Sequence, residues 1–394
     1  MLLASRLSQV QPSATLGVAR KAAELRSRGR HVLDFGAGEP DFASPEVAVA
    51  AAKQALDEGF TKYTVASGIP ELRSSVARRY AEDHDAPWTG DDVVITVGAK
   101  GALFELALAL LGEGDRVVVP SPYWVSFPEQ IRLAGATPVF VPMDPEEGFA
   151  LRAAPLLDAC DEETRMILIN SPCNPTGGLI SAEELEELVE GAAERDLRIV
   201  ADETYDHFVY DGAAHASAAA LARRFPDTVI LVGSFSKTFA MTGWRIGYVA
   251  GPAEVIRGVS LIQGHATSNP TSFAMKGALA VWDGAREEVG AMLAEYQARR
   301  DLVMDHLEEI PGFSCEPPAG AFYAFPRVDE CFGIRGIQGS VDLTETFLEE
   351  AGVAVVPGVA FGADEHVRIS FACSRETLDE GLTRMREAVE EWTG

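Results

Sequence analysis

Lysine is scarce in this chain, with six residues against twenty-seven arginines, while sixty residues are acidic and the formal net charge is −27. Such an acidic surface repels nucleic acids and anionic membranes, and we therefore expect neither as a partner. The charge balance fits a protein adapted to a salty cytoplasm, where counterions screen self-repulsion. An ordinary acidic enzyme from a mesophile explains the same balance equally well.

Cysteine is also sparse, and the five cysteines are scattered along the chain. There is no Cys-x-x-Cys pair, no His-Glu-x-x-His motif and no Gly-Lys-Ser/Thr loop. A metal site and a nucleotide-hydrolysing site are therefore without support, and the thiols fit a reducing cytoplasm best. No apolar run is long enough to span a membrane, and no signal-peptide pattern occurs. We expect a cytoplasmic protein.

The most informative stretch surrounds Lys237. It follows the apolar run 228–233, which predicts a strand, and it lies among Ser234, Ser236 and, slightly later, Arg245. A lysine in such a setting suits a Schiff base with an aldehyde cofactor, while the hydroxyls and Arg245 hold a phosphate. An exposed lysine at a strand end is the alternative, since most lysines are exposed.

Two further apolar runs, 165–170 and 197–201, also end in polar residues. Asn174 follows the first run, and Asp202 and Tyr205 follow the second. The carboxyl ends of parallel strands share one edge of a sheet, so these side chains can converge with the lysine on one flat ring. Asp202 would then keep a pyridine nitrogen protonated, and the other two would hydrogen-bond the phenolic oxygen. A helix N-cap or an ion pair explains Asp202 as well, and the first turn can be an ordinary one.

A strand is also predicted for 93–97, and Gly98, Ala99 and Lys100 open the apolar helix that follows it. Small residues at a helix start leave backbone N–H groups free for an anion. The pattern is weak alone, but together with Arg245, which can bind bidentately, it predicts a phosphate site.

With these residues in place, the chain resembles the fold-type I pyridoxal-phosphate enzymes, within them the class I aminotransferases, and most closely the bacterial and archaeal aspartate aminotransferase subgroup. The resemblance covers nearly the whole chain. One small departure is Cys173, where many relatives carry asparagine before Asn174. Further matching segments are 38–42, 62–63, 68–73, 121–124, 318–323, 356–358 and 366–370.

The expected fold is α/β. Alternating strand and helix patterns over 45–290 indicate a mostly parallel sheet covered by helices, such as one over 183–194. The resemblance implies that 45–290 is a large cofactor-binding domain. It also implies a smaller α/β domain built from 1–44 and 291–394, with a helix over 292–307.

The resemblance further implies roles for five residues. Trp124 would stack on the cofactor ring, and Tyr63 would reach the phosphate of a neighbouring subunit, which predicts a homodimer with shared active sites. Arg368 would grip the α-carboxylate of the substrate, with the Gly38 backbone as a second contact. Lys100 would bind a side-chain carboxylate, although it would equally assist the phosphate or be solvated. The segment 12–15 resembles the one that closes over dicarboxylic substrates.

The predicted function is a pyridoxal 5'-phosphate-dependent aminotransferase with Lys237 as the catalytic residue, working by a ping-pong mechanism on aspartate and 2-oxoglutarate. Prephenate, aromatic or alanine substrates remain open, as does a carbon–sulfur β-lyase on the same scaffold. A ligand-sensing module of a transcription factor would need a basic DNA-binding segment, and we see none before Gly17 or after Arg386. The intact set of Lys237, Asp202, Asn174 and Arg368 argues against a non-catalytic protein.

Overall fold

The centre of the fold is a seven-stranded sheet in the order β2-β8-β7-β6-β5-β3-β4. The computed structural model describes residues 3–393. Within this sheet, β8 runs antiparallel to both of its neighbours and the other pairings are parallel. The mostly parallel α/β sheet predicted from the sequence is thereby confirmed. The strands are β2 (Val93–Thr96), β3 (Arg116–Ser121), β4 (Thr137–Pro142), β5 (Thr164–Asn170), β6 (Arg198–Asp202), β7 (Val229–Ser234) and β8 (Gly247–Ala250).

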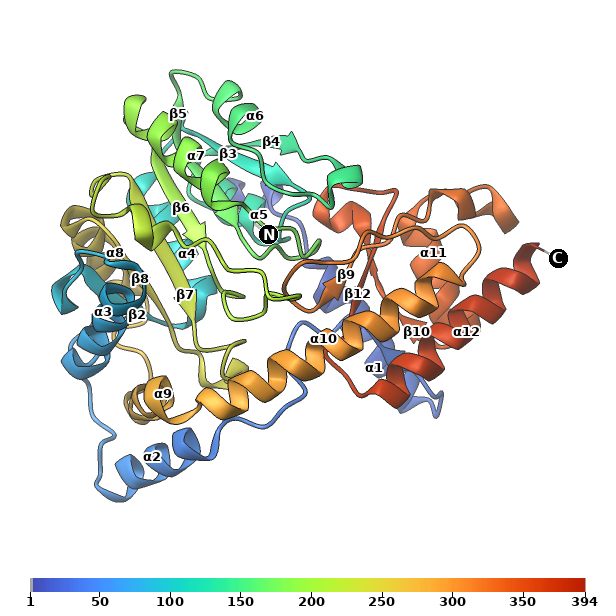
Figure 1. Cartoon of the computed structure of the whole chain (residues 1–394), viewed down its shortest axis with the longest axis horizontal. Helices are drawn as coiled ribbons and strands as arrows, with labels where there is room; N and C mark the ends of the chain where they lie inside the picture. Colours follow the sequence, from blue (N-terminus) through green and yellow to red (C-terminus); the bar gives the residue numbers. More distant parts are fainter. Residues whose placement is uncertain (1–2, 394) are drawn as a thin grey trace.

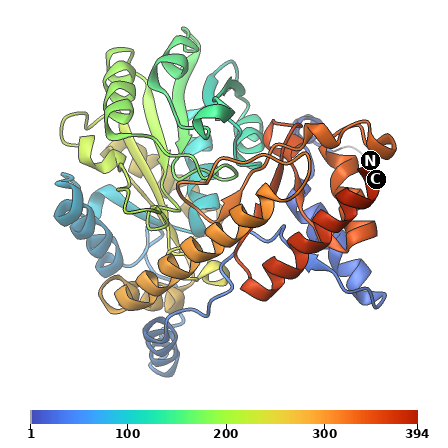
Figure 2. The ribbon, with the colours of Figure 1, turned by 45° about the vertical axis from the view of Figure 1, so that its right-hand side comes forward.

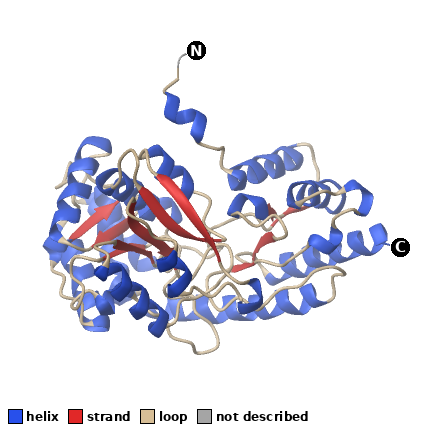
Figure 3. Ribbon diagram, turned by 90° about the horizontal axis from the view of Figure 1, so that it is seen from above, coloured by secondary structure: helices blue, strands red, loops and turns tan. Residues whose placement is uncertain are grey.

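Helices lie on both faces of this sheet, as Figure 3 shows. In α7, Leu185, Leu188, Val189 and Ala192 are buried at helical spacing, and the Ser181 hydroxyl accepts a hydrogen bond from the Glu184 N–H at the helix start. The helix expected over 183–194 is confirmed. The covering helices are α3 (Pro70–His84), α4 (Gly98–Leu110), α5 (Phe127–Leu133), α6 (Ala153–Asp158), α7 (Ala182–Glu194), α8 (Ala253–Ala266) and α9 (Ser272–Gly284). Helix α2 (Glu46–Asp57) lies farther out and packs against α9 (Figure 1).

A second, smaller group of elements combines the two ends of the chain (Figures 1 and 2). Strand β1 (Leu33–Asp34) pairs in parallel with β10 (Val353–Ala354), which joins the N-terminal segment to the C-terminal part. Beside this pair lies a three-stranded antiparallel sheet in the order β11-β12-β9. The other members of the group are β9 (Tyr323–Ala324), β11 (Val356–Pro357), β12 (Val367–Ser370), α1 (Ala14–Ser27), α11 (Ser340–Thr346) and α12 (Arg375–Thr393).

Helix α10 (Arg286–Glu308) runs from the large sheet to the smaller group (Figure 1). It begins six residues before the helix expected over 292–307. The sequence did not predict this start because the first turn, Arg286, Glu287 and Glu288, is charged and lacks the apolar spacing of a buried helix face. The boundary placed at 290/291 falls inside this helix, and the division into domains stays a prediction. Short 3-10 turns lie at Ser5–Gln9, Gly90–Asp92, Pro145–Glu147, Ala218–Leu221, Thr242–Trp244, Asp329–Cys331, Ile334–Gly336 and Gly358–Phe361, with a π turn at Phe347–Ala351.

The register of the large sheet brings its polar strand ends together. Asn170 at the end of β5 pairs with Asp202 at the end of β6, and Asp202 pairs with Val232 near the end of β7. The residues that follow these strands therefore share one edge of the sheet, as predicted. No helix within residues 3–393 is both long and apolar enough to cross a bilayer.

Candidate active site

A cavity of about 660 Å³ lies at this edge of the sheet, between the strand ends and the smaller group of elements. Twelve of the fourteen residues predicted for the site line it, and they come from segments far apart in the sequence. The twelve are Gly38, Ala99, Lys100, Trp124, Asn174, Asp202, Tyr205, Ser234, Ser236, Lys237, Arg245 and Arg368.

Lys237 lies in the turn after β7 and is half-buried. Its Nζ donates a hydrogen bond to the Gly38 carbonyl oxygen at 2.5 Å. Burial lowers the pKa of this amine to about 8; Glu39 opposes the shift, and Arg245 and Arg368 add to it. About a tenth of the amine is therefore neutral at pH 7, far more than for an ordinary lysine, and the neutral amine is the form that attacks an aldehyde.

Asp202 is the last residue of β6 and is only 5% exposed. Its Oδ1 accepts hydrogen bonds from the Thr204 backbone N–H (3.1 Å) and the Thr204 hydroxyl (2.6 Å), so it stabilises a turn and does not cap a helix. Burial raises the pKa of this carboxyl to about 6, although the Thr204 bonds oppose the rise. Since no ion pair to Asp202 occurs within residues 3–393, the site has room for a cationic partner in the cavity.

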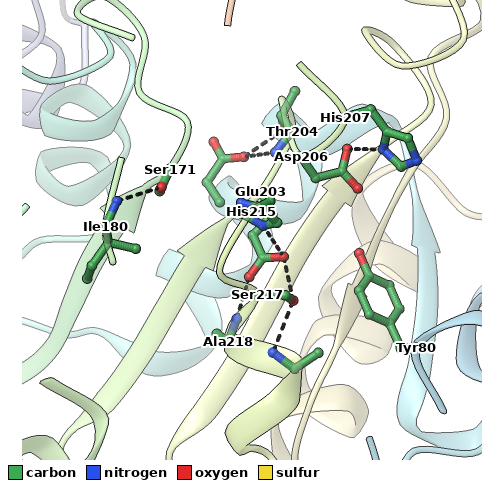
Figure 4. Close-up of polar contacts among 12 residues, drawn as sticks. Tyr80, Ser171, Ile180, Glu203, Thr204, Asp206, His207, His215, Ser217 and Ala218 are labelled. Carbon is green, nitrogen blue, oxygen red and sulfur yellow. Dashed lines mark hydrogen bonds and ion pairs between the residues drawn. The ribbon is translucent and has the colours of Figure 1, made fainter. Parts of the chain in front are cut away.

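The next residue, Glu203, fixes this turn from behind (Figure 4). Its carboxylate accepts hydrogen bonds from the Ala218 N–H (2.7 Å), the Ser217 hydroxyl (2.7 Å) and His215 Nε2 (3.0 Å). Burial lowers the pKa of His215, but the Glu203 carboxylate outweighs that effect, and the net shift is upward. His215 therefore stays protonated to a higher pH, and its hydrogen bond to Glu203 holds the segment beside Asp202 in place.

Asn174 and Arg368 meet on the other side of the cavity. The Asn174 backbone N–H donates to Asn170 Oδ1 at 2.8 Å, and Arg368 Nη1 donates to Asn174 Oδ1 at 3.1 Å. Arg368 Nη2 donates to the Gly36 carbonyl at 2.8 Å. Arg368 is 2% exposed, and its Nε has no hydrogen-bond partner among the described residues. A buried guanidinium with an unused N–H fits a carboxylate ligand, because that charge and those oxygens would satisfy it.

The start of α4 and Arg245 form an anion-binding corner. Gly98 has a φ of +71°, and a Cβ at this position would lie 2.4 Å from Arg245 Nη2, so only glycine lets the guanidinium lie against the helix start. Gly98 itself does not line the cavity. Within residues 3–393, helix α4 has no side-chain cap hydrogen bond at its N-cap residue, Val97, and its first N–H groups are therefore available to an anion. Ser234 and Ser236 line the same cavity.

An aromatic and a cationic side chain form a further wall. The Lys100 amine lies 4.8 Å from the ring centroid of Trp124, which packs edge-on against Phe127 at 5.4 Å. Burial is the main cause that lowers the pKa of Lys100, and the positive charge of Arg245 adds to it. The half-buried Trp124 thus presents an aromatic plane at the cavity.

Tyr63 is not brought to the cavity of its own chain, since it is 90% exposed and is absent from the lining. Its contact with a neighbouring subunit stays a prediction.

Several lining residues were not predicted from the sequence. Tyr323 lay in a matched segment without a role, Asn170 was identified only as the end of a strand, and Thr204 follows Asp202 in the sequence. The sequence signals for these residues were their positions at strand ends or in matched segments. Which of their side chains enter the cavity depends on packing between distant parts of the chain, which the sequence does not show. The other unassigned members of the lining are Leu16, Ala19, Asp34, Gly36, Ala37, Glu39 and Thr242.

The residues present fit pyridoxal phosphate on four counts. The cavity contains a lysine amine with a lowered pKa for the aldehyde and a buried carboxyl for the ring nitrogen. It also contains a cradle at Gly98 and Arg245 that a Cβ would fill, suited to the phosphate, and the aromatic face of Trp124.

Comparison with known proteins agrees with this geometry. The family model for aminotransferase class I and II matches residues 30–385. The aspartate aminotransferase of Bacillus subtilis (strain 168) is 42% identical over 390 residues, which is 99% of either chain. The probable aspartate/prephenate aminotransferase of Aquifex aeolicus is 43% identical over 391 residues, again 99% of either chain.

The solved structures give the same result. The aspartate aminotransferase from Thermus thermophilus with maleate superposes with a TM-score of 0.93 at 40% identity, over 98% of this chain and 99% of that one. The aspartate aminotransferase from Rhizobium meliloti gives 0.94 at 36% identity, over 99% of both chains. This chain therefore belongs to the class I and II aminotransferases and is a pyridoxal-phosphate-dependent enzyme.

Proposed function

We propose that this aminotransferase moves the amino group of L-aspartate to 2-oxoglutarate by a ping-pong mechanism. The observation that carries the proposal is that one cavity holds both the half-buried amine of Lys237 and the buried guanidinium of Arg368, whose Nε has no partner in the described part of the chain. A planar guanidinium binds a carboxylate through two parallel N–H···O bonds, which orients an amino acid relative to the lysine. The Gly38 backbone, which lines the same cavity and whose carbonyl accepts the hydrogen bond from Lys237, is the second contact proposed for this carboxylate.

Pyridoxal phosphate supplies an aldehyde that carries the amino group and a ring that accepts electrons from the substrate's α-carbon. Lys237 would hold the aldehyde through its amine and would act as the general base that moves the proton at the substrate's α-carbon. Asp202 would keep the ring nitrogen protonated, because a buried carboxylate that has no ion-pair partner among the described residues favours a cation beside it. Asn174 and Tyr205 would donate hydrogen bonds to the ring's phenolic oxygen, and Trp124 would stack on the ring.

The phosphate is held by the start of α4 at Ala99 together with Ser234, Ser236 and Arg245. We infer that Tyr63 completes this site in a second copy of the chain, so that the enzyme works as a cytoplasmic homodimer with shared active sites. The support is that Tyr63 is an aromatic side chain 90% exposed and outside the cavity of its own chain.

The preference for a dicarboxylate rests on Lys100, whose amine beside Trp124 is a second cation, separate from Arg368, for a side-chain carboxylate. Thr15, at the end of the N-terminal segment 12–15 expected to close over such substrates, also lines the cavity. The relative from Bacillus subtilis is named an aspartate aminotransferase, and that from Thermus thermophilus is solved with maleate, itself a dicarboxylate. Closure would move the smaller domain, 1–44 with 291–394, toward the domain formed by 45–290.

Prephenate is a second candidate acceptor. The Aquifex aeolicus relative is named as a probable aspartate/prephenate aminotransferase, and prephenate carries two carboxylates, like 2-oxoglutarate. The same two cations would therefore serve both acceptors.

The test is the visible absorption of the purified, cofactor-loaded protein before and after addition of L-aspartate without any keto acid. We expect the visible band to disappear and a band typical of pyridoxamine phosphate to replace it. The Lys237→Ala variant should show no turnover.

Steady-state rates with aspartate, glutamate, alanine and phenylalanine then identify the preferred amino donor, and a clear preference for alanine or phenylalanine contradicts the dicarboxylate assignment. Release of pyruvate and ammonia from a cysteine-type substrate without a keto acid would instead identify a β-lyase.

A further inference from the structure

Two tyrosine hydroxyls share a hydrogen bond inside the cavity. The Tyr205 and Tyr323 oxygens lie 2.9 Å apart, and both residues line the cavity. Both are buried, at 4% and 1% exposure. Tyr205 follows β6 of the large sheet and Tyr323 begins β9 of the smaller group, so this bond connects the two parts of the molecule.

Counting protons decides the direction of this bond in the cofactor-loaded enzyme. A tyrosine hydroxyl has one proton, and within residues 3–393 neither hydroxyl has another hydrogen-bond partner. If Tyr205 donates its proton to the phenolic oxygen of the ring, it has none left for Tyr323. Tyr323 must then donate to Tyr205. A hydroxyl that accepts a hydrogen bond becomes a stronger donor, so this arrangement strengthens the bond from Tyr205 to the ring.

The ring of Tyr323 makes an independent contact with the carboxylate-binding residue. The guanidinium carbon of Arg368 lies 4.4 Å from its centroid, a cation–π distance. Tyr323 lies on β9 and Arg368 on the neighbouring strand β12, where Ser370 pairs with Tyr323. Gly38 lies close as well, since a Cβ there would come 3.1 Å from the Tyr323 hydroxyl oxygen. One side chain thus contacts the residue proposed for the ring oxygen and the residue proposed for the substrate carboxylate.

We propose that Tyr323 is a positioning residue of this enzyme, whose hydroxyl directs the Tyr205 proton to the cofactor and whose ring supports the Arg368 guanidinium. The inference rests on the proposed function, because it assigns Tyr205 to the phenolic oxygen of bound pyridoxal phosphate. Tyr323 thus makes two contributions that can be tested separately. Its hydroxyl acts, through Tyr205, on the phenolic oxygen of the cofactor, and its aromatic face acts, through Arg368, on the substrate carboxylate.

A matched pair of hydroxyl deletions tests the first contribution. Tyr323→Phe removes the shared hydrogen bond, while Tyr296→Phe removes a buried hydroxyl that has no partner in the described residues and does not line the cavity. Tyr296 belongs to the same aromatic cluster, with Phe322 at 5.3 Å, so it controls for packing. The absorbance of the visible band of each cofactor-loaded protein is titrated from pH 5 to pH 10. The measured quantity is the apparent pKa of this titration, the pH at which half of the absorbance change has occurred.

We expect Tyr323→Phe to raise this apparent pKa by about half a unit or more, because a weaker bond from Tyr205 stabilises the ring's oxygen anion less. Tyr296→Phe should leave it where the wild type has it. A Tyr323→Phe titration that superposes on that of the wild type overturns the inference and leaves the proposed function intact. A wild-type protein that forms no visible band with pyridoxal phosphate overturns both.

The second contribution is read from the dissociation constant of maleate, the dicarboxylate found with a structural relative. Tyr323→Phe keeps the ring under Arg368 and should bind maleate within about twofold of the wild type, whereas Tyr323→Leu should bind it about fivefold or more weakly. The melting temperatures of the cofactor-free variants establish that each is folded. Equal maleate affinity in folded Tyr323→Leu and wild-type protein contradicts a role for the ring.

Discussion

Arg368 Nη1 donates a hydrogen bond to Asn174 Oδ1 across 3.1 Å, joining β12 of the smaller group to the turn that follows β5. The other arm of the guanidinium donates to the Gly36 carbonyl, so Arg368 is held from two sides before any substrate arrives. This bond also engages the amide oxygen of Asn174, which leaves the amide nitrogen as its donor to a ligand. The residue proposed for the substrate carboxylate and a residue proposed for the cofactor ring are therefore physically linked.

Arg368→Lys should raise the KM for aspartate by about 10- to 100-fold, because an ammonium cannot make two parallel bonds to the carboxylate while also holding Asn174 and Gly36. The measurement is steady-state kinetics over a range of aspartate concentrations. Arg327→Lys is the control, since Arg327 is exposed, pairs with Asp329 and does not line the main cavity. A KM for the Arg368→Lys variant within twofold of the wild type would show that the carboxylate is bound elsewhere.

Gly98→Ala should weaken pyridoxal phosphate binding by about tenfold or more, since the new methyl would displace the Arg245 guanidinium and the residue has a left-handed φ. The dissociation constant is measured by titrating the cofactor-free protein with pyridoxal phosphate. Gly101→Ala is a matched control in the same helix, where the nearest atom to the added Cβ is 3.6 Å away. It should bind normally and melt at the same temperature or slightly higher, because alanine favours a helix. Equal losses in the two variants would argue for a general effect on α4.

The sequence was sufficient to predict the parallel strands β5, β6 and β7 and the polar residues that follow them. Buried parallel strands appear as continuous apolar runs, and their carboxyl ends necessarily share an edge. Asn174, Asp202 and Lys237 could therefore be placed together without any structure.

What escaped prediction depends on contacts between distant segments. Tyr323 reaches the cavity because the two-residue strand β9 pairs with β12. A strand of two residues is too short to show the alternation of apolar and polar residues by which strands are predicted. The positive φ of Arg245 has no sequence signal, since non-glycine residues rarely adopt it. The hydrogen bond between Glu203 and His215 could not be predicted either, because no hydrophobic pattern in the sequence indicates that these two segments lie side by side.

Added salt should raise the melting temperature of the protein. At a net charge of −27, self-repulsion opposes the folded state, and screening shortens from about 10 Å at 0.1 M to about 3 Å at 1 M salt. Exposed ion pairs such as Arg223–Asp85 weaken at the same time, but each contributes little. Thermal unfolding between 0.1 and 2 M KCl measures the balance, with sucrose as a non-ionic control. A flat or falling melting temperature in KCl would identify an acidic enzyme without adaptation to salt.

Asp202 should destabilise the cofactor-free protein at neutral pH. Its folded-state pKa of about 6 lies above the ordinary 3.8, so folding favours the protonated carboxyl. The contribution is fully favourable below pH 4 and is lost as the pH rises through 6, which amounts to about 3 kcal/mol of unfolding free energy. Asp202→Asn keeps an oxygen acceptor for Thr204 and carries no charge. At pH 8 the cofactor-free variant should therefore be more stable than the wild type by up to about 3 kcal/mol.

Urea unfolding of the two cofactor-free proteins at pH 4 and pH 8 measures this difference, because the other titrating groups are common to both and cancel. The gain should be about 3 kcal/mol at pH 8 and only about 0.5 kcal/mol at pH 4, close to the ordinary pKa of the carboxyl. The same substitution should weaken pyridoxal phosphate binding, since the ring nitrogen loses its anionic partner. A gain of equal size at both pH values would show that the asparagine merely packs better. Stabilisation found mainly at pH 8 and accompanied by lost cofactor affinity would show that the buried charge is kept for the cofactor, at a cost to the fold.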